Sequence, residues 1–184
     1  MRVYLAGPEV FFRDAAAIAS AKKAICARHG LTGVFPTDPH PETSAESEDR
    51  WRIYAQNEAH LRGCDALIAN LTPFRGPSAD AGTVFEVGFM RALGRPVFGY
   101  AHVAGDFAQR TLASLGPHVR RRPDGAWEDE QGMQVEEFGL VDNLMVDGGI
   151  RASGGALLTG APAPWDDLTL FERCAQSAAT LLRR

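Results

Sequence analysis

Short apolar runs alternate with longer segments of helical spacing over the first hundred residues of the chain. The runs of strand length are 3–6, 31–35, 65–71 and 97–100, and the segments of helical spacing between them are 12–29, 50–63 and 84–93. The run DALIANL is apolar over strand length, which is typical of a parallel strand covered on both faces. The regular alternation of strand and helix predicts an open, twisted α/β sheet with right-handed crossovers.

The pattern weakens outside these elements. Residues 36–49 are rich in proline and acids and are expected to form a surface loop, and 101–135 are polar, with a short helix expected at 106–115. The small residues of 148–164 indicate a linker or an ordered irregular crossing. An apolar stripe at helical spacing runs along 165–184, which predicts a helix docked on the sheet.

Composition narrows the class of protein. The chain has 184 residues and a net charge of −4, which argues against a nucleic acid or membrane bound by bulk charge. The three cysteines, Cys26, Cys64 and Cys174, are widely spaced without C-x-x-C. This excludes a disulfide framework and a zinc ribbon and favours the reducing cytoplasm. We expect no membrane span, because no apolar run approaches about 18 residues, and no secretory signal at the N-terminus.

The loop TPFRGPSADAGT, after the run 65–71, is the most informative segment for chemistry. It is long for a strand-to-helix connection, and ligands of open α/β sheets bind at the carboxyl ends of the strands. Asp80 lies in this loop, and Glu86 follows six residues later among apolar neighbours. Two converging carboxylates suit chemistry at an oxocarbenium-like centre, with one as nucleophile. The alternative is a structural Glu86 that accepts hydrogen bonds from N–H groups of the loop.

Three segments resemble one known family. CDALIANLTPFRGPSADAGTVFEVGFMRALGRPVFGY, the opening RVYLAGP and the later DNLM resemble the nucleoside 2-deoxyribosyltransferase family over residues 1–147. The resemblance implies a flavodoxin-like, three-layer αβα fold with an open, mostly parallel sheet of about five strands. It also implies that residues 1–147 form the family's domain, and that 148–184 add a linker and a C-terminal helix packed on the same domain.

The resemblance implies transfer of 2-deoxyribose between nucleobases, with retention at the anomeric carbon, through a covalent deoxyribosyl-enzyme. By position in the motif, Glu86 is the nucleophile, Asp80 binds the sugar hydroxyls, and Tyr4 orients the nucleophile. No metal and no cofactor are expected, because the chain has no H-E-x-x-H motif and no clustered ligands.

The resemblance also implies substrate contacts. Gly7, Arg75 and Gly76 are expected to line the base and sugar pocket. Asn143 and Met145 match residues that family members lend to the active site of a neighbouring subunit, with Asn143 reaching the sugar 5′-hydroxyl. We therefore expect a homodimer or higher homo-oligomer with shared active sites.

One position departs from the family. Asn57 stands where many relatives have an aspartate that acts on the nucleobase. An amide can hydrogen-bond a base edge but is a poor proton donor. The leaving base would then receive its proton from Asp80 or from a water, or the bound substrate would already be protonated.

Three functions compete at this point. The first is a transferase acting on free deoxynucleosides and nucleobases in nucleotide salvage. The second is an N-glycosidase that hydrolyses (deoxy)nucleosides or nucleoside 5′-monophosphates, and the third is a non-catalytic nucleotide-sensing domain. Glu9, expected to repel a phosphate, and Asn143, expected to bind a 5′-hydroxyl, favour a nucleoside over a nucleotide.

Overall fold

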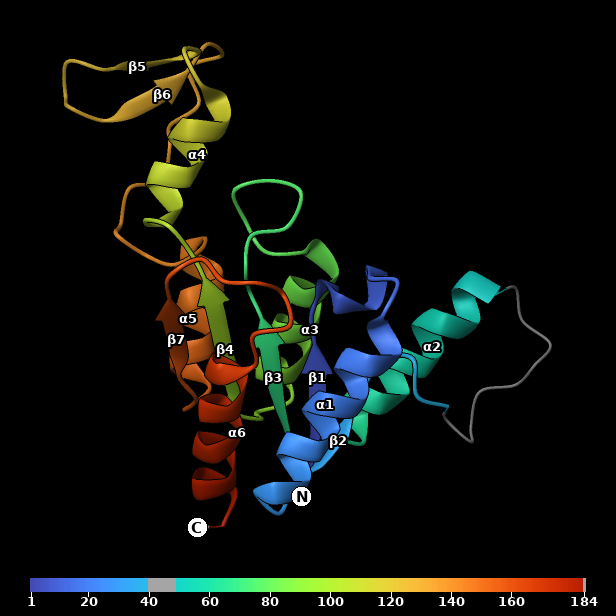
Figure 1. The fold of residues 1–184 in the computed structure, drawn as a ribbon. Helices are drawn as coiled ribbons and strands as arrows, with labels where there is room; N and C mark the ends of the chain where they lie inside the picture. The colour runs from blue at the N-terminus through green and yellow to red at the C-terminus, as the bar shows by residue number, and fades with distance from the viewer. Residues whose placement is uncertain (40–48, 184) are drawn as a thin grey trace.

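The computed structural model describes residues 1–39 and 49–183 (Figure 1). The strands are β1 (Arg2–Ala6), β2 (Thr32–Val34), β3 (Ala66–Asn70), β4 (Val97–His102), β5 (Val119–Arg121), β6 (Trp127–Asp129) and β7 (Leu157–Gly160). The helices are the 3₁₀ helix η1 (Pro8–Phe11) and α1 (Ala15–Arg28), α2 (Asp49–Arg62), α3 (Ala81–Ala92), α4 (Phe107–Leu115), α5 (Leu144–Ala152) and α6 (Thr169–Leu182). None of the helices in these residues is both long and apolar enough to cross a bilayer. Most of the loop expected at 36–49 lies outside the described residues.

The main sheet of the described residues has five strands in the order β2-β1-β3-β4-β7, and all its pairings are parallel. This is the strand order of flavodoxin-like folds, so the predicted fold class is confirmed. The order reverses between β1 and β3, because β2 lies on one side of β1 and β3 on the other. Ligands bind at the carboxyl ends of strands at such a switch point, so the loops after β1 and β3 border the expected site.

Helices cover both faces of this sheet (Figure 1). α1 and α6 pack together on one face, and α2, α3 and α5 cover the other. Side chains alternate along each strand, so β1 gives Val3 and Leu5 to the core under α1 and α6, and Tyr4 and Ala6 to the opposite core. The three layers and the docking of α6 on the sheet agree with the prediction.

The prediction of a linker or an irregular crossing at 148–164 is wrong, because this segment contains the end of α5 and the whole of β7. Its small residues serve close packing instead: a Cβ on Gly155 would lie 1.8 Å from the carbonyl oxygen of Val97, at the start of β4. α5 also runs across residue 147, where we expected the family's domain to end. That division of the chain remains a prediction.

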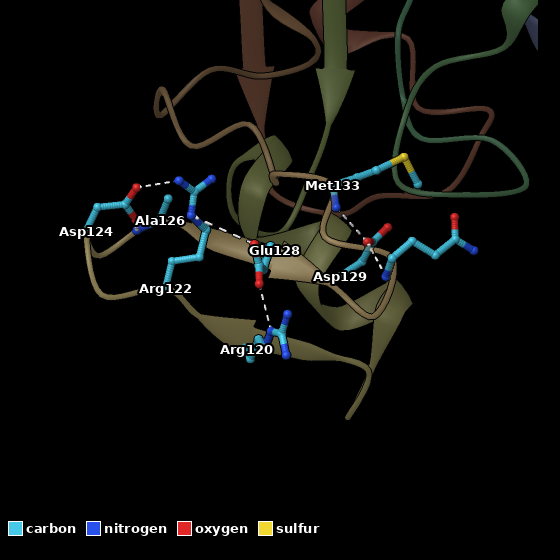
Figure 2. Close-up of polar contacts among 8 residues, drawn as sticks. Arg120, Arg122, Asp124, Ala126, Glu128, Asp129 and Met133 are labelled. Carbon is cyan, nitrogen blue, oxygen red and sulfur yellow. Dashed lines mark hydrogen bonds and ion pairs between the residues drawn. The ribbon is translucent and has the colours of Figure 1, made fainter.

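Between β4 and α5 the chain forms an arm, residues 106–138, that extends from the carboxyl end of β4 (Figure 1). It begins with α4, as expected, and continues into an antiparallel hairpin of β5 and β6 that the sequence did not predict. Ion pairs accompany the antiparallel backbone pairing of the hairpin: Arg120 and Arg122 contact Glu128, and Arg122 also contacts Asp124 (Figure 2).

Candidate active site

A tyrosine and a glutamate from distant parts of the sequence meet on the α2–α3 side of the sheet. Tyr4 lies in β1, between Val34 of β2 and Leu67 of β3, and is fully buried. Its hydroxyl donates a 2.6 Å hydrogen bond to Oε1 of Glu86. Glu86 lies beside the buried stripe of α3, so the helix brings its carboxylate to the edge of the core. The structure thus joins two of the three residues expected to be catalytic.

The surroundings of Glu86 favour the protonated form of its carboxyl group more strongly than bulk water would. Burial is the main reason that the pKa of Glu86 is raised to about 7; the hydrogen bond from Tyr4 lowers this pKa and the charge of Asp80 raises it. Burial and the adjacent carboxylate also hold the pKa of Tyr4 well above its ordinary value, so Tyr4 remains a donor. No cation of the described residues acts on Glu86. A buried carboxylate without a counter-ion is typical of reactive sites.

Asp80 forms the N-cap of α3. Its side chain accepts hydrogen bonds from the backbone N–H of Thr83, at 2.9 Å, and from the Thr83 hydroxyl, at 3.1 Å. Because this cap lies near Glu86, its charge contributes to the raised pKa of that residue. Asp80 therefore caps the N-terminus of α3, and Glu86 accepts its hydrogen bond from Tyr4 instead.

The loop after β1 is shaped by a second buried carboxylate. Glu9 is 0% exposed and forms an ion pair with Lys22 of α1, with a further hydrogen bond of 2.8 Å from Asn70. Gly7 is needed beside it, because a Cβ there would lie 2.0 Å from Oε2 of Glu9. The expectation that Glu9 would repel a phosphate is therefore wrong, since Lys22 neutralises its charge inside the protein.

The loop after β3 presents Arg75 to solvent. Arg75 has a positive φ of 57°, which is uncommon for a residue with a side chain. Its guanidinium lies 4.6 Å from the ring centre of Phe74 and 5.3 Å from that of Phe11, and these two rings are stacked. Gly76 follows in open space, where a Cβ would meet nothing within 4 Å. Both residues thus lie at the carboxyl edge of the sheet, with Arg75 packed on aromatic rings.

Asn57 lies on the inward-facing side of α2, one turn before the buried Leu61. Its Oδ1 is buried and has no hydrogen-bond partner among the described residues. Leu61 packs in the same core as Tyr4, and α2 packs against α3. Asn57 therefore offers an unused acceptor on the side of the sheet that carries Glu86.

Asn143 and Met145 lie apart from Glu86 in this chain. Asn143 is the N-cap of α5, and Met145 is 79% exposed. Both line a cavity of about 840 Å³ between α3 and α5, with Gly88 and Arg91 on the α3 side. At about 100° per residue, Glu86 projects from the opposite side of α3. The structure therefore does not bring Asn143 and Met145 to the Glu86 of the same chain.

A model of the nucleoside 2-deoxyribosyltransferase family matches residues 3–145. The chain belongs to this family. An uncharacterized protein of Schizosaccharomyces pombe is 32% identical over 165 residues, covering 83% of this chain and 78% of that protein. A 2-desoxiribosyltransferase from Leishmania mexicana is similar in structure, with a TM-score of 0.59 and 29% identity, over 79% of this chain and 84% of that one. A conserved protein from Enterococcus faecalis V583 shares the fold, with a TM-score of 0.55 and 19% identity over 94% of this chain and 96% of its own.

The nucleoside 2-deoxyribosyltransferase family acts on nucleosides and nucleobases, and membership indicates a glycosyl-transferring enzyme. The matched region begins in β1 and ends in the first turn of α5, so it contains Tyr4, Asp80, Glu86 and Asn143. β7 and α6 lie outside it.

Sequence reasoning missed three groups around this family site: Lys22, Arg110 and Asp142. Lys22 is 1% exposed, on the stripe that α1 turns inward. A lysine at an inward position of an alanine-rich helix, here the first of the pair Lys22-Lys23, is a readable signal for a buried ion pair. Asp142, directly before Asn143, is 0% exposed. Arg110 gives no such signal, because its partners are backbone carbonyl groups, two of which belong to the distant Pro77 and Val141.

Proposed function

We propose that this chain is a nucleoside 2-deoxyribosyltransferase that works by retaining double displacement through a covalent deoxyribosyl-Glu86 intermediate. The observation that carries the proposal is the hydrogen bond from Tyr4 to a raised-pKa Glu86 at the switch point of the sheet. A structural carboxylate in such surroundings would have a cation beside it, as Glu9 has.

The proposed reaction has two steps. In its ionised form, Glu86 attacks the anomeric carbon through Oε2, because Tyr4 binds Oε1. The new C–O bond forms as the N-glycosidic bond breaks, and the base leaves with the electron pair and takes up a proton. A nitrogen of a second base then attacks the same carbon, gives up its proton, and displaces the Glu86 carboxylate. Two inversions give net retention.

The proton for the leaving base does not come from Asn57, whose amide is a poor acid. We propose that Asn57 hydrogen-bonds the base edge with its unused acceptor, and that Asp80, a water, or protonation of the bound substrate supplies the proton. Asp80 also binds the sugar hydroxyls, and Gly7, Arg75 and Gly76 line the pocket.

The active site is completed by a second copy of the chain. Asn143 and Met145 lie on the far side of α3 from Glu86 of their own chain, on an open cavity wall. From there they can reach a neighbouring copy, where Asn143 would bind the sugar 5′-hydroxyl. The enzyme is thus a homodimer or a higher homo-oligomer. Its free, buried cysteines suit the cytoplasm, where we place it in nucleotide salvage.

The test is incubation of the purified protein with deoxyinosine and adenine, followed by chromatography. Deoxyadenosine is the expected product. Hypoxanthine with free sugar would instead establish the hydrolase, and this remains the second candidate because Glu9 no longer argues against a nucleotide substrate. No reaction with any deoxynucleoside or 5′-monophosphate would contradict both and favour a nucleotide sensor.

A further inference from the structure

Asp142 is a buried carboxylate that holds two separate parts of the candidate site. Toward the loop after β3, its Oδ1 accepts a 2.5 Å hydrogen bond from the Ser78 hydroxyl, and its Oδ2 accepts a 2.8 Å bond from the Ala79 N–H. Toward α5, Oδ1 also accepts a 2.7 Å bond from the N–H of Asn143. Ala79 directly precedes Asp80, so one carboxylate links Asp80 to Asn143.

The position of Asp142 is itself fixed from two sides. Asp147 accepts hydrogen bonds from the N–H groups of Val141, at 3.2 Å, and of Asp142, at 2.9 Å. Arg110, from the arm, donates to the carbonyl oxygens of Pro77 and Val141. The arm, the loop and the start of α5 are therefore connected through one polar cluster.

The amide of Asn143 is oriented by the same region. Its Oδ1 accepts from the N–H of Met145 at 3.0 Å, and its Nδ2 donates to Glu136 at 2.7 Å. A rotation at Asp142 would shift this cap together with the loop. Misplacement of a binding group by about 1 Å can cost roughly 10²-fold in rate, so both ends of the link are sensitive to it.

We propose that Asp142 is a positioning residue that serves two active sites at once. It places Asp80 in the site of its own chain through Ser78 and Ala79, and it places Asn143 in the site of a second copy. Both halves rest on the proposed function, in which Asp80 binds the sugar hydroxyls and Asn143 acts across subunits.

The experiment co-expresses two variants with different tags and purifies assemblies that contain both. The reference assembly joins Glu86→Ala with Asn143→Ala, which leaves one intact site of two and is expected to recover activity that neither variant has alone. Recovery here supports action across subunits. Its absence would contradict the proposed shared site, whatever Asp142 does.

Asp142→Asn is then combined with each partner. In the assembly with Glu86→Ala, the intact Glu86 belongs to the chain that carries Asp142→Asn. In this working site only the link from residue 142 to Asp80 is impaired. In the assembly with Asn143→Ala, the working site combines the Glu86 and the unaltered loop of the Asn143→Ala chain with the Asn143 of the Asp142→Asn chain. We expect both assemblies to be about 10-fold less active than the reference. An assembly that equals the reference would overturn the half of the proposal that it isolates.

Two further variants separate positioning from folding. Ser78→Ala removes only the loop-side bond to Oδ1, so it is expected to lower activity with Glu86→Ala but not with Asn143→Ala. Equal activity in both assemblies would contradict the link, even if Asp142→Asn fails to fold. Asp124→Asn, on the exposed hairpin (Figure 2), removes an aspartate outside this cluster and is the matched control, expected to leave activity unchanged.

Discussion

Two glutamates on opposite faces of the sheet show how surroundings decide the role of a carboxylate. Glu9 and Glu86 each accept a hydrogen bond from a buried tyrosine of the central strands, Tyr100 at 3.1 Å and Tyr4 at 2.6 Å. Burial alone would raise the pKa of Glu9, but Lys22 and Asn70 outweigh it and hold this pKa below its ordinary value. Glu86 has no such cation in the part of the chain that the structure describes, and its pKa is raised to about 7.

The difference separates a structural ion pair from the proposed nucleophile. Lys22, which lies 5.6 Å from the ring centre of Tyr100, fixes Glu9 as an ionised, inaccessible group. Glu86 receives only a hydrogen bond from Tyr4 and pairs with no cation of the described residues. In the proposed mechanism, the substrate carbon that develops positive charge is the partner of its ionised form. The following variants test this comparison, in order of decreasing effect.

Glu86→Gln keeps the shape of the side chain and its acceptor for Tyr4 but removes the proposed nucleophile. We expect base exchange to fall by roughly 10⁴-fold or more, with the fold retained by circular dichroism. Glu9→Gln, the matched change on the other face, is expected to retain exchange within about 10-fold. Similar losses in both variants would end the distinction between them.

Lys22→Met leaves Glu9 buried without its cation. We expect a loss of about 3–5 kcal/mol in the free energy of unfolding, measured by urea denaturation. The double variant Glu9→Gln/Lys22→Met should lose less than Lys22→Met alone, because no buried charge remains. A single variant as stable as the unaltered protein would show that the pair is not structural.

Glu86→Gln should also stabilise the fold above neutral pH. The pKa of Glu86 rises from 4.5 to about 7 on folding, so its contribution to stability is full below the lower value and is lost as pH rises through the higher one. Gln cannot ionise and avoids this loss. We expect Glu86→Gln to be more stable by up to about 3 kcal/mol near pH 8, and equal near pH 4. Thermal unfolding at the two pH values measures this, and a gain that is the same at both would argue against a raised pKa.

Tyr4→Phe removes the hydrogen bond that lowers the pKa of Glu86. The acid limb of kcat/KM, set by the ionised nucleophile and expected near pH 7, should therefore move to higher pH. Profiles of Tyr4→Phe and of Glu9→Gln, in which the limb should stay in place, measure the effect. If the limb does not move in Tyr4→Phe, Tyr4 does not influence the ionisation of Glu86.

The sequence predicted the elements with strong periodicity and missed those that depend on packing at a distance. β1 to β4 and their helices follow from apolar runs and glycine caps, and the fold class follows from their order. β7 was missed because the small residues before it suggested a linker, whereas Gly155 is small because it closely approaches Val97 of β4, which no local pattern records. The roles expected of Glu86, Asp80 and Tyr4 came from a motif, whereas the cation beside Glu9 and the links of Asp142 join residues far apart in the chain.

The covalent step at Glu86 is tested most directly by trapping it. The enzyme is incubated with a slowly reacting deoxynucleoside analogue, denatured during turnover and digested, and the peptides are analysed by mass spectrometry. We predict a deoxyribosyl adduct on the peptide that contains Glu86, and no adduct in Glu86→Gln. An adduct on another peptide, or none while exchange proceeds, would contradict Glu86 as the nucleophile.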